Sequence, residues 1–178
     1  MPTIQQIDDA ILIFIQNHMH ADLPDKIMPF ISWLGNNGGI WIAAALLLIF
    51  FKKYRSTGFL ILAVLLVCFI FNDILLKPLV TRLRPCNIQP GAVLLIPRPA
   101  DFSFPSGHSS SSFAAAAIIF FKNRRWGTAA IVLASLIAFS RLYLYVHYPS
   151  DVAAGILLGV ATAFFTVWIV RKYKAGET

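Results

Sequence analysis

A histidine and an aspartate stand four residues apart towards the C-terminal end of the chain, at His147 and Asp151. With Pro149 suited to the first turn of a helix, this spacing lets the carboxylate accept the imidazole Nδ1–H. The opposite ring nitrogen then carries a lone pair and can act as a nucleophile. His108, on another segment, can protonate a departing oxygen and later activate water. Two histidines with separate protonation states suffice for a double-displacement reaction.

Three basic residues, although far apart in sequence, are expected at the same end of the bundle as these histidines and indicate that the reacting group is an anion. Arg84 and Arg141 can hold phosphate oxygens bidentately, and Lys77 adds a point charge, so that together they would stabilise a phosphoryl-transfer transition state. Ser106 is placed to cap the following helix and Gly107 permits close approach to its backbone, so the free N–H groups of that first turn can also hold phosphate. Since no cluster of carboxylates accompanies them, we expect no catalytic metal.

Each of these residues alone has an ordinary structural explanation. Lys77 or Arg84 by itself is more often an interfacial anchor, and His147 with Asp151 can form a structural pair. The combination favours chemistry. For a further set of ionisable residues we prefer the structural explanation and expect no catalytic role: His18, His20, Arg82, Arg98 and Asp101.

The composition is that of a membrane protein. Of the 178 residues, 58% are hydrophobic and 13% are charged, and the mean hydropathy is +0.72. The net charge is +7, and the basic residues lie in short clusters between apolar runs, which argues against nucleic-acid binding. We expect one domain over residues 1–178, no cleavable signal peptide because Asp8 and Asp9 precede the first basic residue, and no disulfide between Cys68 and Cys86.

The elements that must position these residues are membrane-spanning helices. The expected fold is an all-α integral membrane bundle of about five spans, with a catalytic bundle over 30–171, because lipid cannot satisfy open backbone groups. The expected spans are 30–51, 58–76, 106–121, 127–145 and 152–170. The first is interrupted at 35–39, so its opening turns can form a separate segment. Residues 4–19 have one apolar and one polar face, which predicts a helix on the membrane surface; a sixth crossing is the alternative.

Basic residues predict the orientation. The end that carries the chemistry has six, and nine would gather at the opposite end: Lys52, Lys53, Arg55, Lys122, Arg124, Arg125, Arg171, Lys172 and Lys174. The richer end is expected in the cytoplasm. The C-terminus is then inside, and loops 77–105 and 141–151 face the outside of the plasma membrane.

Three segments together resemble the signature of the type 2 phosphatidic acid phosphatase superfamily. The first, 77–85, has lysine, six residues and Arg-Pro; the second, 104–108, reads Phe-Pro-Ser-Gly-His; the third, 140–151, reads Ser-Arg, five residues, His, three residues and Asp. The resemblance covers about 30–171 and departs from the signature nowhere. It implies His147 as nucleophile, Asp151 as its partner and His108 as acid, without a cofactor. It also implies a phosphate site made of Lys77, Arg84, Ser106, Gly107 and Arg141.

The resemblance implies a membrane lipid phosphatase that forms a phosphohistidine on His147. Family members often carry six spans, and residues 4–19 are similar to the surface helix after the usual first one. Since the third span is only about 24 Å long, its catalytic end should lie below the outer surface, which suits a lipid head group. Similar small enzymes hydrolyse undecaprenyl diphosphate, phosphatidylglycerol phosphate or phosphatidic acid. We favour an isoprenoid diphosphate, because recycling that carrier needs an outward-facing site.

Two alternatives stay open at this point. One is a glycerophospholipid phosphatase with the same mechanism. The other is a non-catalytic lipid-binding or lipid-transport protein that keeps the fold. A vanadate-dependent haloperoxidase carries the same signature, but five spans argue against it.

Overall fold

The structure is a computed structural model that describes residues 2–89, 91 and 93–175, with side chains described as far as residue 172. Over these residues it contains helices and loops but no strand, as the all-α prediction requires. In chain order the elements are α1 Ile4–His18, α2 Asp22–Leu34, the 3₁₀ turn η1 Asn36–Gly38, α3 Gly39–Phe50, α4 Arg55–Phe69, the π-helical η2 Ile70–Leu76, α5 Lys77–Val80, α6 Pro85–Ile88, α7 Gly107–Lys122, α8 Arg124–Tyr143 and α9 Pro149–Ala175.

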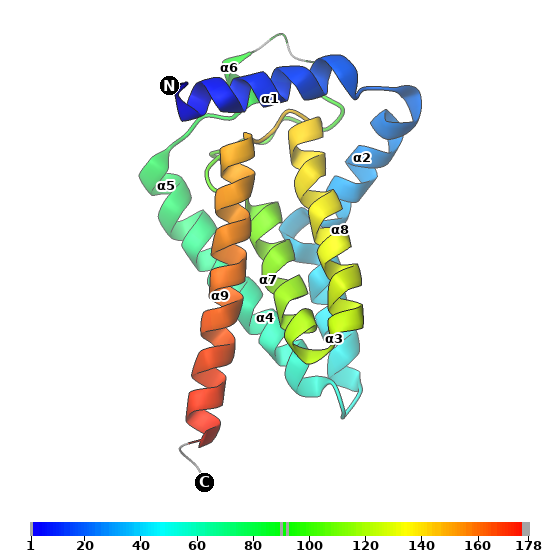
Figure 1. Cartoon of the computed structure of the whole chain (residues 1–178), viewed down its shortest axis with the longest axis vertical. Coiled ribbons are helices and arrows are strands. Elements are labelled where there is room, and N and C mark those ends of the chain that lie inside the picture. The colour runs from blue at the N-terminus through cyan, green and yellow to red at the C-terminus, as the bar shows by residue number, and fades with distance from the viewer. Residues whose placement is uncertain (1, 90, 92, 176–178) are drawn as a thin grey trace.

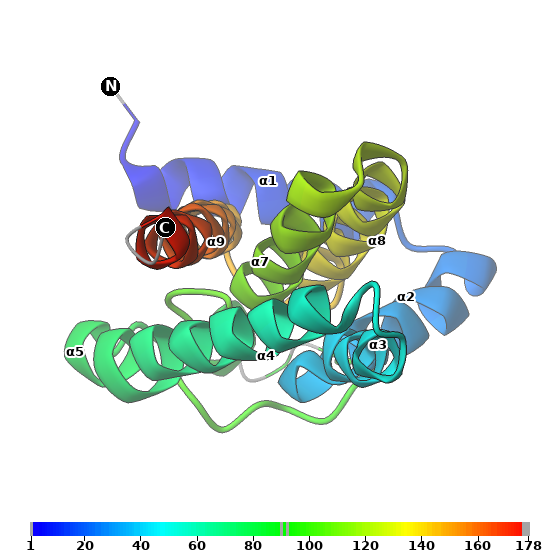
Figure 2. The ribbon, with the colours of Figure 1, turned by 90° about the horizontal axis from the view of Figure 1, so that it is seen from below.

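Helix α7 lies at the centre of the bundle and packs against α4, α8 and α9 (Figures 1 and 2). Three of its four alanines, Ala114, Ala115 and Ala116, have no exposed surface. Short side chains in successive positions let helices approach from several sides, because little volume separates the backbones. This explains how a helix of only 16 residues can lie at the centre.

Helix α9 approaches α7 through two glycines four residues apart. A Cβ atom added at Gly155 would lie 2.6 Å from the carbonyl oxygen of Ser106, and one added at Gly159 would lie 2.2 Å from that of Ser110. Both distances are too short for real atoms, so only glycine permits this contact. The start of α7 is thereby held against the start of α9.

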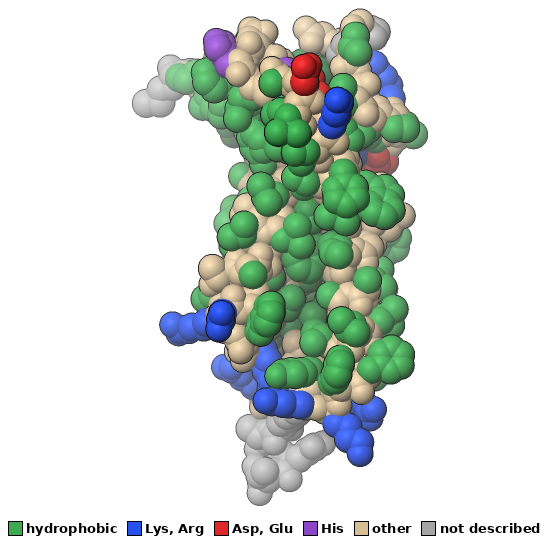
Figure 3. Space-filling model, turned by 90° about the vertical axis from the view of Figure 1, so that its right-hand side faces the viewer, with side chains coloured by type: hydrophobic (Ala, Val, Ile, Leu, Met, Phe, Trp, Pro, Cys, Tyr) green, Lys and Arg blue, Asp and Glu red, His purple; other side chains and the backbone are tan. Residues whose placement is uncertain are grey.

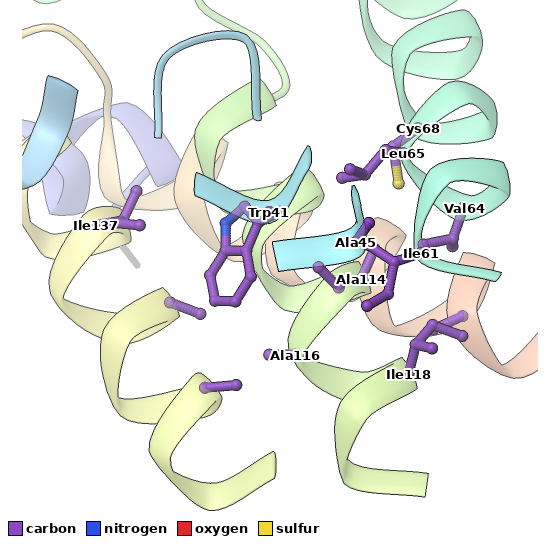
Figure 4. Packing of buried hydrophobic residues seen from close by; sticks show 14 residues of the cluster. Trp41, Ala45, Ile61, Val64, Leu65, Cys68, Ala114, Ala116, Ile118 and Ile137 are labelled. Carbon is purple, nitrogen blue, oxygen red and sulfur yellow. The ribbon is translucent and has the colours of Figure 1, made fainter. Parts of the chain in front are cut away.

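The apolar core fills the half of the bundle away from α1. Figure 4 shows Trp41 of α3 near Ala116 of α7 and Ile137 of α8, with residues of α4 on the other side. The indole Nε1 of Trp41 donates to Ser112 Oγ at 2.9 Å, so its polar atom is satisfied within the core.

Among the described residues, three helical stretches are long and apolar enough to cross a membrane: Arg55–Ile88, Arg124–Tyr143 and Pro149–Lys172. The stretches Asp22–Leu34 and Asn36–Phe50 would form a fourth as one bent span, with a bend of 50°. Helix α7, about 24 Å long, is shorter than the hydrocarbon core of about 30 Å. The chain is therefore a helical membrane protein, and the count of five spans remains a prediction.

The predicted first span began at the wrong residue. The helix begins at Asp22 and not at residue 30, and it ends at Leu34. Asp22 and Asp25 lie in its first turn, where carboxylates favour the positive end of a helix. The predicted interruption does occur, because Asn37 and Gly38 adopt left-handed conformations with φ of 52° and 69°.

Helix α1 extends across the ends of α8 and α9 instead of running along the bundle (Figure 1). Thr3 caps it, and Gln16 Nε2 donates to the carbonyl oxygen of Tyr143 at 3.0 Å. Its inward face is formed by Asp8, Leu12 and Ile15. The helix was predicted correctly to within one residue, and its place on the membrane surface stays a prediction.

Charge is distributed unevenly along the molecule. In Figure 3 a band of hydrophobic side chains separates a basic lower end from an upper end that carries acidic, basic and histidine side chains. Both cysteines, Cys68 and Cys86, are free and buried, as expected.

Candidate active site

A cavity of about 1060 Å³ opens beside the α1 end of the bundle. Its described lining includes six of the eight predicted site residues: Lys77, Arg84, Gly107, His108, Arg141 and His147. The other two, Ser106 and Asp151, have no exposed surface. The backbone N–H of Ser106 donates to the carbonyl oxygen of Asp151 at 3.1 Å, which joins the second signature segment to the third. Three distant stretches of sequence therefore meet at one cavity.

His147 lies in the loop between α8 and α9 and is 1% exposed. Its Nε2 lies 2.8 Å from Arg84 Nη1. Because a guanidinium only donates, Nε2 accepts and the ring proton is on Nδ1. Burial, followed by the charges of Arg84 and Arg141, lowers the pKa of His147 well below its usual value. The imidazole is therefore neutral at pH 7, with the Nε2 lone pair directed at Arg84 Nη1.

Asp151 is oriented towards His147 but does not bond to it directly. Its Oδ2 lies 3.6 Å from Nδ1 of His147, which is longer than a hydrogen bond. Ser103 lies between them: its Oγ donates to Asp151 Oδ2 at 2.5 Å and is 3.4 Å from His147 Nδ1. The structure thus replaces the predicted direct bond by a contact through a serine hydroxyl.

The two cations of the first signature segment share one carboxylate. Asp101 Oδ2 accepts from Lys77 Nζ, and Asp101 Oδ1 accepts from Arg84 Nη2 at 2.8 Å. Burial raises the pKa of Asp101, but the hydrogen bond from Lys77 and the charge of Arg84 outweigh it and lower this pKa to about 2. The Asp101 carboxylate thus pairs with two of the cations that were predicted to bind phosphate.

Arg84 and Lys77 have other contacts that hold them in place. Arg84 donates to the backbone oxygens of Val146, at 2.7 Å, and of Asp101, at 2.9 Å. Lys77 also pairs with Asp73, one turn earlier, at 2.5 Å. Asp73 belongs to the π-helical η2, and such irregular turns are common at functional sites.

Arg141 reaches the cavity from the last turn of α8 and is 4% exposed. Its Nη1 donates to Ser32 Oγ on α2. Its Nε is buried and has no hydrogen-bond partner among the described residues. A buried donor of this kind favours a ligand that accepts hydrogen bonds.

The first turn of α7 also lines the cavity, through Gly107 and His108. Ser106 caps it, since its Oγ accepts from the backbone N–H of Ser109 at 3.4 Å and from the hydroxyl of Ser109 at 2.9 Å. A Cβ added at Gly107 would lie 4.0 Å from Lys77 Nζ, so the glycine is not required by the protein's own packing. The space that it leaves lies beside the ion pair of Lys77 and Asp73, whose Oδ2 is also 4.0 Å away.

His108 follows directly, and its Nε2 lies 2.9 Å from Asn36 Oδ1 of η1. A Cβ added at Gly35 would lie 2.8 Å from the ring of His108. At the break between α2 and α3, the backbone of Gly35 and the carboxamide of Asn36 therefore lie against the ring of His108.

Sequence reasoning gave no role to several residues that the structure places at the site. Arg82 donates to Asp151 Oδ1 at 2.6 Å, Asp101 pairs with the two cations, and Ser103 contacts Asp151. Arg98 also lines the cavity and donates to the carbonyl oxygen of Cys86. The only sequence signal was their proximity to the first two signature segments. His18 and His20 are exposed and are not among the cavity's described lining residues.

The described residues offer no group of three or more His, Cys, Asp and Glu side chains placed to hold a metal ion. Chemistry at the cavity can be assigned to the residues present: one neutral imidazole, three cations around the space beside it, and a second imidazole on a facing helix. This is the equipment that transfer of a phosphoryl group requires.

Comparisons with known proteins agree with this chemistry. The chain is 33% identical to an undecaprenyl-diphosphatase of Sulfolobus acidocaldarius, over 80% of this chain and 69% of that protein. It is 32% identical to a lipid A 4'-phosphatase of Bacteroides thetaiotaomicron, over 97% of this chain and 80% of that protein. The crystal structure of a transmembrane PAP2 type phosphatidylglycerolphosphate phosphatase from Bacillus subtilis has a TM-score of 0.78, with 26% identity over 97% of this chain and 88% of that one.

The names of these relatives favour an enzyme over a non-catalytic lipid-binding protein. The model of one family, described as the PAP2 superfamily, matches residues 56–175, a stretch that contains all eight predicted site residues. The chain therefore belongs to the PAP2 superfamily and is a membrane lipid phosphatase of that type.

Proposed function

We propose that the chain removes the terminal phosphate of an isoprenoid diphosphate, such as undecaprenyl diphosphate, through a phosphohistidine on His147, at a site that faces the outside of the plasma membrane. The observation that carries the proposal is the composition of the cavity wall. The wall holds His147 and the cations, and it also includes Trp33, Leu66 and Phe69. A single space thus offers a phosphate site beside an apolar surface, which suits a phosphorylated lipid.

In the first step, the Nε2 lone pair of His147 attacks the terminal phosphorus. The bond from phosphorus to the bridging oxygen breaks, and the lipid monophosphate leaves with a proton from His108. Arg84, whose Nη1 now faces Nε2, turns that N–H to a phosphoryl oxygen. Lys77 and Arg141 bind the remaining oxygens, so the charge that develops is stabilised by fixed cations.

In the second step, water gives a proton to His108 and its oxygen attacks phosphorus. The bond to Nε2 breaks, and orthophosphate is released. Throughout both steps the Nδ1 proton stays on His147, where Ser103 and the Asp151 carboxylate stabilise the positive charge of the phosphorylated ring. The enzyme returns to its starting protonation state.

The relatives support a lipid phosphate but differ in the lipid. One is named for undecaprenyl diphosphate, one for lipid A and one for phosphatidylglycerolphosphate. We favour the isoprenoid diphosphate, because an outward-facing site suits recycling of that carrier; the relative named for it is 33% identical over 80% of this chain. A glycerophospholipid phosphatase with the same chemistry is the second candidate.

The test is hydrolysis by the purified protein of undecaprenyl diphosphate, phosphatidylglycerol phosphate and phosphatidic acid, measured as orthophosphate released. We expect the diphosphate to have the highest kcat/KM, and a preference above tenfold for a glycerolipid would support the second candidate instead. His147→Ala should abolish activity and phosphoenzyme trapping, whereas His18→Ala, at an exposed histidine, should change neither. Full activity of His147→Ala would contradict the mechanism, as would strong inhibition by EDTA.

A further inference from the structure

A buried set of polar contacts connects the N-terminal helix to the catalytic aspartate. Asp8, on the inward face of α1, is 2% exposed although it is a carboxylate. Its Oδ2 accepts from Arg82 Nη2 at 2.7 Å. Arg82 Nη1 in turn donates to Asp151 Oδ1 at 2.6 Å. The side chain of Arg82 therefore connects Asp8 of α1 to Asp151, the partner of His147.

Asp8 also holds the start of α9 directly. Its Oδ1 accepts from the backbone N–H of Ser150 at 2.8 Å, and its Oδ2 accepts from the Ser150 hydroxyl. Ser150 precedes Asp151 in the first turn of α9. A carboxylate that accepts backbone N–H groups at a helix start fixes that turn and is favoured by the helix dipole. Asp8 thus constrains the backbone beside Asp151 as well as its side-chain partner.

The guanidinium of Arg82 is divided between two carboxylates. Its Nη1 serves Asp151 and Ser150, and its Nη2 serves Asp8 and Gln5, while its plane lies 4.0 Å from the ring centre of Tyr148. The planar, forked shape of arginine suits this bridging role, and the single ammonium of lysine does not. Each carboxylate therefore depends on the other for the position of the shared cation.

We propose that Asp8 and Arg82 are positioning residues for the phosphoryl-transfer reaction, which fix the Asp151 carboxylate so that it holds His147 in its reactive orientation. The inference rests on the proposed role of His147. Among the described residues, neither Asp8 nor Arg82 lines the cavity, so neither contacts the substrate. Their effect must pass through Asp151, which makes α1 part of the catalytic apparatus.

If the buried Asp8–Arg82 ion pair served only to attach α1 to the bundle, the expected result would be different. Loss of such a pair lowers the free energy of unfolding and leaves the chemistry of the folded fraction intact. Loss of a positioning pair lowers kcat in protein that is fully folded, because small errors in orientation slow the chemical step about 10- to 100-fold. Binding of phosphate at Lys77, Arg84 and Arg141 should not change.

The experiment compares Asp8→Asn, Arg82→Lys and the double variant with the unaltered protein in detergent micelles. It measures kcat, KM, the inhibition constant of orthophosphate, the rate of phosphoenzyme formation in a single turnover, and Tm. Asp9→Asn is the matched control: it removes the same charge from the same helix, but Asp9 is exposed and Gln5, which donates to its carboxylate, can still donate to the new amide. Asp8→Glu restores the carboxylate.

We expect kcat and the single-turnover rate to fall about 10- to 100-fold in Asp8→Asn and Arg82→Lys, with KM and the orthophosphate inhibition constant within about twofold. The double variant should lose little more than either single variant, because both act through Asp151, and Asp8→Glu should recover part of the rate. Unchanged kcat in both single variants would overturn the inference, as would losses that simply follow Tm. His147→Ala, measured beside these variants, tests the proposed function separately: if it retained activity, the proposed function itself would fail.

Discussion

Asp101 lies where the substrate's phosphate is expected, paired with Lys77 and Arg84. Its pKa of about 2 is below the ordinary 3.8, so its stabilising contribution is complete above about pH 4 and is lost only as the pH falls towards 2. At neutral pH it is therefore an anion that competes with phosphate for two cations. We expect substrate binding to displace it from them.

We expect Asp101→Asn to strengthen inhibition by orthophosphate about two- to fivefold at pH 7. The two cations would lose one counter-charge, while Arg84 keeps two backbone acceptors and Lys77 keeps Asp73. The effect should be modest because the Asp101 side chain is 49% exposed and such pairs contribute at most about 1 kcal/mol. The measurement is the inhibition constant of orthophosphate, with Asp22→Asn as an exposed control. Weaker inhibition would mean that Asp101 holds the cations in place.

At the scale of residues, the sequence predicts those whose identity is fixed by chemistry. Lys77, Arg84 and His108 were predicted by type and spacing, and the structure brings them to one cavity. Ser103 and Arg82 were not, because their contacts with Asp151 join positions 48 and 69 residues apart. Serine and arginine are common in loops, and nothing local distinguishes a residue that orients an aspartate.

At the scale of elements, helices were predicted from apolar runs and their ends from Gly, Pro and charge. Segments 4–19, 106–121 and 127–145 correspond closely to α1, α7 and α8. The start of α2 was missed, because Asp22 and Asp25 interrupt the apolar run although they favour a helix start. The crossing of α7 and α9 was also beyond reach, since Gly155 and Gly159 acquire their meaning only beside Ser106 and Ser110.

Substitution of Gly159 tests the crossing of α7 and α9. A methyl group at Gly159 would lie 2.2 Å from the carbonyl oxygen of Ser110, so Gly159→Ala must push α9 away from α7. We expect a loss of about 1–3 kcal/mol in the free energy of unfolding and a fall of several degrees in Tm in detergent. Activity should fall as well, because the same contact holds Asp151 next to Ser106.

The control for the glycine prediction is Gly39→Ala. Gly39 is also helical, but a Cβ there meets only the carbonyl oxygen of Leu34, at 3.8 Å, which is an ordinary contact. Alanine is a better helix former than glycine, so Tm should stay the same or rise slightly. Equal Tm values for the two variants would show that α7 and α9 are not held by this crossing.

At the scale of the whole molecule, the two ends differ in charge. All seven aspartates lie in α1, α2, η2, the loop after α6 or the start of α9, towards the end that carries the cavity. The opposite end has basic residues at the end of α7 and the start of α8, and no acidic residue among its described side chains (Figure 3). The positive-inside rule predicts that the basic end lies in the cytoplasm, with the cavity outside.

Labelling with a membrane-impermeant maleimide tests this orientation in intact cells. Both native cysteines are buried, so they should react slowly and leave a low background. Asp22, at the start of α2, and Lys53, between α3 and α4, are exposed, and these two parts of the chain lie near opposite ends of the bundle (Figure 1). We expect Asp22→Cys to be labelled in intact cells, and Lys53→Cys only after permeabilisation. The reverse pattern would place the phosphate site in the cytoplasm, where a carrier lipid on the outer leaflet could not reach it, and would favour a glycerophospholipid of the inner leaflet as the substrate.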